Sequence, residues 1–156
     1  MPVGDVARKD GTHHVYDIRH YLDYARTNSD IANDLERVWI VGALIAVGDA
    51  LDKRNYLNRV PLLELVRHLR NGVAHGNAFD IRNPDSLKKF PAHNRRALVK
   101  TAEFEITVAL DGRPVLFDFM GAADVLDVLI STETFLTRIR ERRQMAELDD
   151  LLKALP

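Results

Sequence analysis

Cysteine is absent from the 156 residues of the chain. Its absence excludes disulfides, cysteine-based zinc sites and thiol catalysis, and it fits a reducing compartment. We therefore expect a cytoplasmic protein. The chain also lacks an excess of basic charge, because 22 Lys and Arg stand against 23 Asp and Glu, for a net charge of −1. A nucleic-acid partner would have to be held by a local patch and not by the field of the whole chain.

Long apolar runs are missing as well. The most apolar stretch, Val38–Val47, is too short to span a bilayer, and the N-terminal residues lack the apolar core of a signal peptide. We therefore expect no membrane partner. The composition, 46% hydrophobic and 29% charged, is that of a globular protein. A chain of this length suits a single domain, residues 1–156, with a sizeable core.

Helical periodicity dominates the pattern. Apolar residues recur every three or four positions in four stretches, and each stretch predicts a helix. These are residues 14–27, 31–53, 61–75 and 122–142. Residues 77–97 predict a loop with at most one short helical turn. Residues 1–12 are expected to be flexible, and residues 144–156 to form a short amphipathic tail.

The period changes to two between residues 102 and 119. Apolar and polar residues alternate from Phe104 to Leu110, the pair Asp111-Gly112 is typical of a tight turn, and apolar residues alternate again from Val115 to Phe119. This pattern predicts an inserted antiparallel β-hairpin over 102–119. The predicted fold class is therefore mostly α, a helical bundle with one β-hairpin.

The stretch 61–75 has the clearest boundaries. Pro61 suits the first turn of a helix, and Gly76 suits a left-handed cap at its end. Its apolar positions share one arc of the helix: Leu62, Leu65, Val66, Leu69 and Val73. The opposite side, which is mostly polar, holds Glu64, Arg67, Arg70, Asn71, Ala74 and His75. The pattern therefore predicts a coherent polar face.

Three residues of this face suit metal-free cleavage of RNA. Arg70 offers a planar fork for phosphate oxygens, His75 can move a proton near neutral pH, and Asn71 could orient either of them. Arg70 and His75 are about 140° apart around an ideal helix, so a second copy of the chain could help to complete a site. The alternative is a solvated helix face whose cations lie favourably at the helix C-terminus.

The segment Leu65-Val66-Arg67-His68-Leu69-Arg70-Asn71-Gly72-Val73-Ala74-His75-Gly76 resembles the signature helix of HEPN domains. Members of that family are helical bundles with an arginine, a polar residue directly after it and a histidine four to six residues on. Many are metal-independent endoribonucleases of toxin–antitoxin or phage-defence systems that act as homodimers. The resemblance implies that Arg70, Asn71 and His75 are catalytic, and that an antitoxin protein is a possible partner.

Further residues complete this hypothesis. Glu64 and Arg67 are possible supporting residues on the motif helix. Residues 82–100 form a basic stretch that could contact single-stranded RNA, or could be a solvated loop. Its candidate RNA-binding residues are Lys88, Lys89, Arg95 and Arg96. No cofactor and no metal ion are expected, because the histidines lack partners at ligand spacing.

Two other interpretations stay open. The chain could be a catalytically inactive helical dimer that binds a nucleotide or a protein, or a purely structural dimerisation domain.

Within the second predicted helix, Gly42 and Gly48 are interpreted as sites of close helix packing. Asp49 in that helix is interpreted as a surface charge or a member of a local ion pair.

Overall fold

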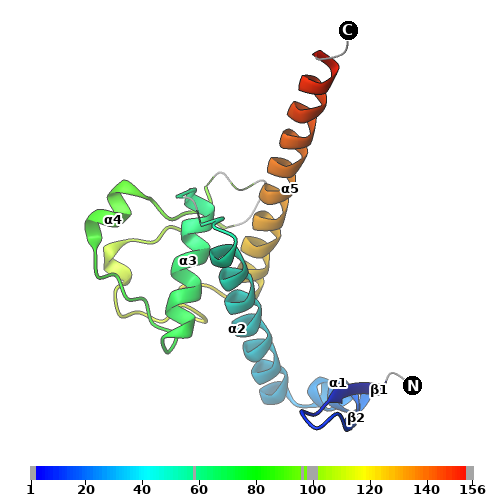
Figure 1. Ribbon diagram of the computed structural model, residues 1–156. Coiled ribbons are helices and arrows are strands. Elements are labelled where there is room, and N and C mark those ends of the chain that lie inside the picture. Colours follow the sequence, from blue (N-terminus) through cyan, green and yellow to red (C-terminus); the bar gives the residue numbers. More distant parts are fainter. Residues whose placement is uncertain (1–2, 58, 96, 98–101, 154–156) are drawn as a thin grey trace. The chain divides into compact units, whose positions relative to one another are not determined.

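A computed structural model describes residues 3–57, 59–95, 97 and 102–153 of the chain (Figure 1). Within these residues the chain is mostly helical and has one two-stranded antiparallel sheet, which confirms the predicted fold class. The chain divides into two compact units, Met1–Trp39 and Ile40–Pro156. The organisation as a single domain stays a prediction.

The first unit contains the sheet. Strand β1 (Val3–Ala7) pairs with β2 (His13–Asp17), and helix α1 (Ile18–Thr27) follows directly. Residues 1–12, which we expected to be flexible, thus include a strand, and the first helix begins later than residue 14. Asp17 explains the later start, because its side chain caps α1 by accepting the backbone N–H of Arg19 at 2.9 Å.

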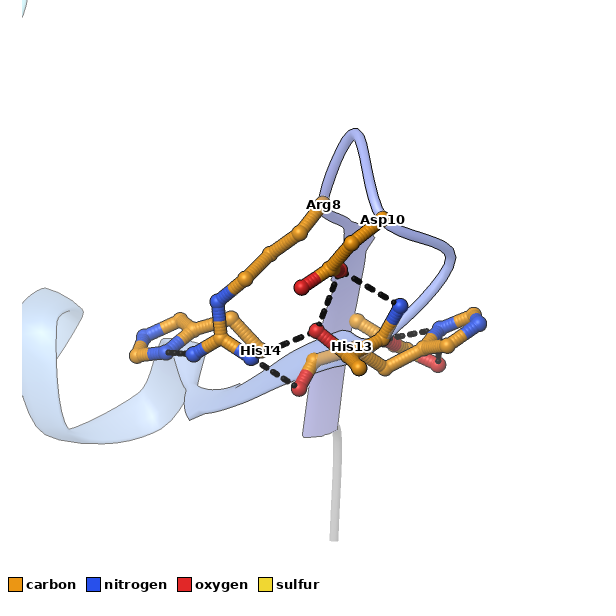
Figure 2. Close-up of polar contacts among 6 residues, drawn as sticks. Arg8, Asp10, His13 and His14 are labelled. Atoms are coloured by element: carbon orange, nitrogen blue, oxygen red, sulfur yellow. Dashed lines mark hydrogen bonds and ion pairs between the residues drawn. The ribbon is translucent and has the colours of Figure 1, made fainter.

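The turn between the two strands is closed by side chains. Arg8 donates to the hydroxyl of Thr12 at 3.2 Å and to the carbonyl of His13 at 3.0 Å (Figure 2). Asp10 accepts the hydroxyl and the backbone N–H of Thr12 at 2.7 and 2.9 Å, and these bonds lower the pKa of its carboxyl group. Gly11 supplies the left-handed backbone, at φ +82°, that the turn requires.

The long helices lie close to the predicted stretches. They are α2 (Ser29–Lys53), α3 (Pro61–Ala74) and α5 (Ala122–Lys153), and the polar stretch after α3 holds the short α4 (Pro84–Lys89). Helix α5 was predicted to end at residue 142, before a separate tail. It continues to Lys153, because no proline or glycine interrupts its last turns, and residues 154–156 lie outside the described residues.

The hydrophobic core lies in the second unit, where α3 packs against α5. Ile40 and Leu44 of α2, Leu65 and Leu69 of α3 and Val125 of α5 are each 0% exposed. Burial of each such side chain stabilises the fold by about 1.5–3 kcal/mol. None of the helices in the described part of the chain combines the length and the apolar character that a membrane crossing requires.

The hairpin predicted at 102–119 is not formed. In place of two paired strands, this described segment contains a 3-10 helix, Val108–Leu110, and extended stretches joined to other parts of the chain. The turn at Asp111-Gly112 is present, with Gly112 at φ +74°. The alternation fails after it, because Leu116 is buried and Phe117 is exposed.

The extended stretches pair with distant segments and not with each other. Asn94 donates its backbone N–H to the carbonyl of Phe104 at 3.2 Å, and Ile106 donates to Ala92 at 2.9 Å. Phe79 donates to Arg113 at 3.0 Å in the same way. The period of two correctly indicated extended backbone. The backbone partners came from the segments before and after α4, which local sequence cannot specify.

Candidate functional site

The motif helix α3 begins and ends where the sequence predicts. Pro61 occupies its first turn, and His75 is the residue that caps its C-terminus. The backbone N–H of His75 donates to Asn71 at 3.1 Å and to Gly72 at 3.3 Å, and Gly76 follows at φ +89°. The left-handed glycine ends the helix and leaves the His75 side chain exposed beyond the last turn.

Arg70 is held by two side-chain acceptors, the carboxylate of Asp49 and the amide oxygen of Asn71. Its Nε donates to Asp49 Oδ1 at 2.7 Å, its Nη2 contacts the same oxygen, and its Nη1 donates to Asn71 Oδ1 at 3.1 Å. The Arg70 side chain is 33% exposed, so part of the guanidinium group reaches solvent. The interpretation of Asp49 as a member of a local ion pair is confirmed.

Gly48 makes room for this arginine. A Cβ atom at position 48 would lie 2.5 Å from Cγ of Arg70, far closer than van der Waals contact. The interpretation of close packing is therefore confirmed for Gly48. It is wrong for Gly42, where a Cβ would meet no atom of the described structure within 4 Å.

The motif glycine, Gly72, has a comparable packing role. A Cβ atom on Gly72 would lie 2.3 Å from Cγ2 of Val115 and 3.0 Å from the carbonyl oxygen of Ala78. Gly72 also accepts the backbone N–H of Ala78 at 3.1 Å. The glycine after Asn71 thus lets the chain that follows α3 fold back closely against the helix.

A small hollow of about 130 Å³ opens beside Arg70, and its lining comes from α2, α3 and the segment between them. The lining residues are Gly48, Asp52, Leu57, Arg67, Arg70 and Asn71. Arg67 is fixed there because it donates to the carbonyl of Leu57 at 3.0 Å. Two guanidinium groups and an amide bring hydrogen-bond donors for an oxyanion to one hollow, while Asp52 in its lining and the pairing of Arg70 with Asp49 and of Arg67 with Glu64 offset their charge.

Glu64 does not lie on an exposed polar face. It is 3% exposed, and its carboxylate lies 3.3 Å from Arg67 and 3.6 Å from Arg59. Charge neutralisation by two arginines explains why an acidic residue is tolerated inside the helix packing. The contacts of Glu64 therefore position Arg67, which lines the hollow, while a supporting role in chemistry stays a prediction.

His75 is not among the described residues that line the hollow. The polar face thus brings together Arg67, Arg70 and Asn71 and leaves the histidine beyond the helix end. Another histidine, His68, lies within α3, where burial lowers its pKa and the neighbouring Arg67 lowers it further. Its neutral form is therefore favoured in the folded chain.

The candidate RNA-binding residues are largely engaged within the chain. Lys88 pairs with Asp85 at 2.9 Å, Arg95 pairs with Glu105, and the ammonium group of Lys89 lies 5.2 Å from the centre of the Phe90 ring. Arg96 lies outside the described residues. These surface pairs are weak, so they can be exchanged for phosphate contacts at small cost.

Sequence reasoning missed Asp52 as a residue of the hollow. Asp52 follows Asp49 by three residues, so both acids lie on one side of α2, next to Gly48. This spacing could have indicated that Asp52 lies near Arg70.

Comparisons of the chain with protein-family models, curated proteins and solved structures found no match. The resemblance of residues 65–76 to HEPN domains stays a prediction.

Proposed function

We propose that the chain is a metal-independent endoribonuclease of the HEPN type, of the kind found in toxin or phage-defence systems. The observation that supports this best is the hollow that Arg67, Arg70 and Asn71 share. In this proposal, one phosphate group of an RNA strand binds there through the N–H donors of the two arginines and of the Asn71 amide.

The reaction follows from the chemistry of RNA itself. The 2′-oxygen of a ribose attacks the adjacent phosphorus, the bond from phosphorus to the 5′-oxygen breaks, and a 2′,3′-cyclic phosphate remains. A base takes the proton from the 2′-hydroxyl, and an acid gives a proton to the 5′-oxygen. In this proposal Arg70 stabilises the charge on phosphorus, His75 transfers a proton, and Asn71 positions Arg70 through their hydrogen bond.

The proposal includes a homodimer. His75 follows Arg70 by five residues, about 140° around the helix, and the hollow of one chain does not include it among the described residues. A second copy could bring its own His75 to the hollow, so that each site uses residues of both chains. RNA and a second copy are therefore the proposed partners, with an antitoxin protein as a possible third.

An RNA cleavage assay in excess EDTA tests the proposal. The native chain should cut single-stranded RNA and leave 2′,3′-cyclic phosphate ends, and His75→Ala and Arg70→Ala should each lose this activity. Arg113→Ala is the matched control, because Arg113 is an exposed arginine paired with Asp118 outside the hollow. Equal cutting by all variants, or none by the native chain, would contradict the proposal.

One observation favours a second candidate, an inactive binding module. All three guanidinium nitrogens of Arg70 already have partners on Asp49 and Asn71 within the chain. In this candidate, Arg70 serves to hold α2 and α3 together. This candidate predicts that no RNA is cut, while a nucleotide or a protein partner still binds, which calorimetry with ATP and co-purification can measure.

A further inference from the structure

A second, larger cavity opens at the other end of α3, near its first turn. Its volume is about 530 Å³, within the range of small-molecule sites. Its apolar walls include Pro61 at the start of α3, Pro91 from the loop after α4, and Phe135 from α5. We call it the proline pocket. It lies about 13 Å along the helix axis from Arg70, so it is separate from the hollow described above.

Two polar side chains of the proline pocket have unused hydrogen-bonding atoms. Ser131 is 1% exposed, and neither its Oγ nor Nδ1 of His93 has a hydrogen-bond partner in the described part of the chain. Buried polar atoms are almost always paired, so each exception requires an explanation. His93 is fixed in place, because its backbone N–H donates to the carbonyl of Pro61 at 3.1 Å.

The neighbours of Ser131 make this observation sharper. Thr132 donates its hydroxyl to the carbonyl of Val128 at 2.8 Å, and Thr134 donates to Ile130 at 2.9 Å. The hydroxyl of each threonine therefore donates a hydrogen bond to a backbone carbonyl one turn earlier in α5. A serine in a helix can make the same bond. Ser131 does not make it, so the hydroxyl of this lining residue is buried without a partner among the described residues.

The charge at the rim indicates what kind of molecule fits. Arg95 is the cation among the described lining residues, and Glu105 already neutralises it. The walls are apolar, so a charged ligand would lose its hydration without a free counter-charge. A hydroxyl can donate and accept, and an imidazole nitrogen can do one or the other, which suits a ligand that carries both a donor and an acceptor.

We propose that the proline pocket binds a small, neutral, flat ring that carries an amide, with Ser131 and His93 as its hydrogen-bonding partners. The ring packs between the proline and phenylalanine walls, and the amide replaces the partners that Oγ and Nδ1 lack. Nucleobases and aromatic carboxamides both belong to this chemical class. The site is separate from the proposed catalytic residues, none of which lines it, and it shares only Arg95 with the candidate RNA-binding residues.

Benzamide is the probe for this proposal, titrated into the full ¹⁵N-labelled chain and followed by the shifts of backbone amide signals. We expect the signals of His93 and Ser131 to move, with an affinity in the millimolar range that is usual for so small a ligand. Toluene, which lacks the amide, and benzoate, which is charged, should each bind at least about tenfold more weakly.

Ser131→Ala should weaken benzamide binding about tenfold, the effect of one lost hydrogen bond. This variant should fold normally, because it removes a hydroxyl that has no partner. Thr134→Ala is the matched control, since its hydroxyl bonds within α5, and it should bind benzamide as the native chain does. Unmoved His93 and Ser131 signals, equal binding of toluene, or unchanged affinity in Ser131→Ala would each overturn the proposal.

Discussion

Gly48 of α2 lies directly against the side chain of Arg70 of α3, so closely that a Cβ atom at position 48 would lie 2.5 Å from Cγ and 2.8 Å from Cβ of the arginine. These two atoms lie close to the backbone of Arg70. They therefore cannot move away by a change of rotamer as easily as the guanidinium group could. The position of Arg70 thus depends on a residue of another helix that carries no chemistry of its own.

Replacement of Gly48 by alanine should therefore displace Arg70. Crowding costs about 1–3 kcal/mol, and the better helix propensity of alanine returns about 1 kcal/mol, so we expect a net destabilisation of about 1 kcal/mol. Gly42→Ala is the control on the same helix, where the space is open, and it should stabilise by about 0.5–1 kcal/mol. Urea unfolding measures both, and an equal gain in both variants would contradict the contact.

Asp49→Asn tests how Arg70 is positioned, on the basis of the proposed ribonuclease function. The variant keeps the shape of the side chain but loses the ionic bond that orients the guanidinium group. We expect kcat to fall about tenfold, because orientation contributes to the rate, while RNA binds more tightly at low salt because one negative charge is gone.

Asp52→Asn is the control for that experiment. It makes the same charge change one turn further along α2, in the lining of the hollow, but no described hydrogen bond joins Asp52 to Arg70. Its RNA affinity should rise as in Asp49→Asn, while kcat stays at the native value. A fall in kcat of similar size in both variants would show that charge, and not the positioning of Arg70, sets the rate.

Glu64→Gln should destabilise the fold, because Arg59 and Arg67 would lose the buried carboxylate between them. We expect a loss of about 2 kcal/mol in the free energy of unfolding, less than a fully buried pair would cost, since both arginines reach solvent. Asp85→Asn breaks an exposed pair with Lys88 and should change stability by less than about 0.5 kcal/mol. Matching losses in the two variants would refute the buried role of Glu64.

His68 should make stability depend on pH. Burial and Arg67 lower the pKa of His68 in the folded chain below its ordinary value of 6.5, so the unfolded chain binds the proton more readily. The contribution of His68 to stability is complete above pH 6.5 and decreases as the pH falls below that value. Urea unfolding at a series of pH values between 7.5 and 5 should show this decrease.

The variant His68→Gln should lose part of that pH dependence, because glutamine does not titrate in this range. Gln144→Ala, an exposed position without a titratable group, serves as the control and should keep the native dependence. An unchanged dependence in His68→Gln would mean that other groups cause it.

Local sequence predicted the motif helix well. Pro61 and Gly76 act within one turn of the chain, so the beginning and end of α3 follow from the sequence alone, and so does the apolar arc of Leu65 and Leu69. The prediction was wrong about the surroundings of Glu64. Helix periodicity places a residue on a face, but only the partner segments, here Arg59 and the residues near it, decide whether that face is covered.

The extended segments show the same limit more strongly. The alternation around Phe104 and Ile106 correctly indicated extended backbone, but strand pairing is a contact between segments. The segment after α4 supplied the partners, through Ala92 and Asn94. For the same reason, no local pattern could indicate that His93 and Ser131 line one cavity, since they lie 38 positions apart in the chain.

The sequence by itself therefore determined the helical class, the limits of α3 and the grouping of Arg67, Arg70 and Asn71 on one side of it, because these depend on contacts within a turn or two. Tertiary structure alone decided that Gly48 and Asp49 hold Arg70, that Glu64 is buried, and that a second cavity exists. Such features arise where segments that are distant in the chain come into contact. The interaction free energy depends on both segments together, so the sequence of one segment alone does not reveal it.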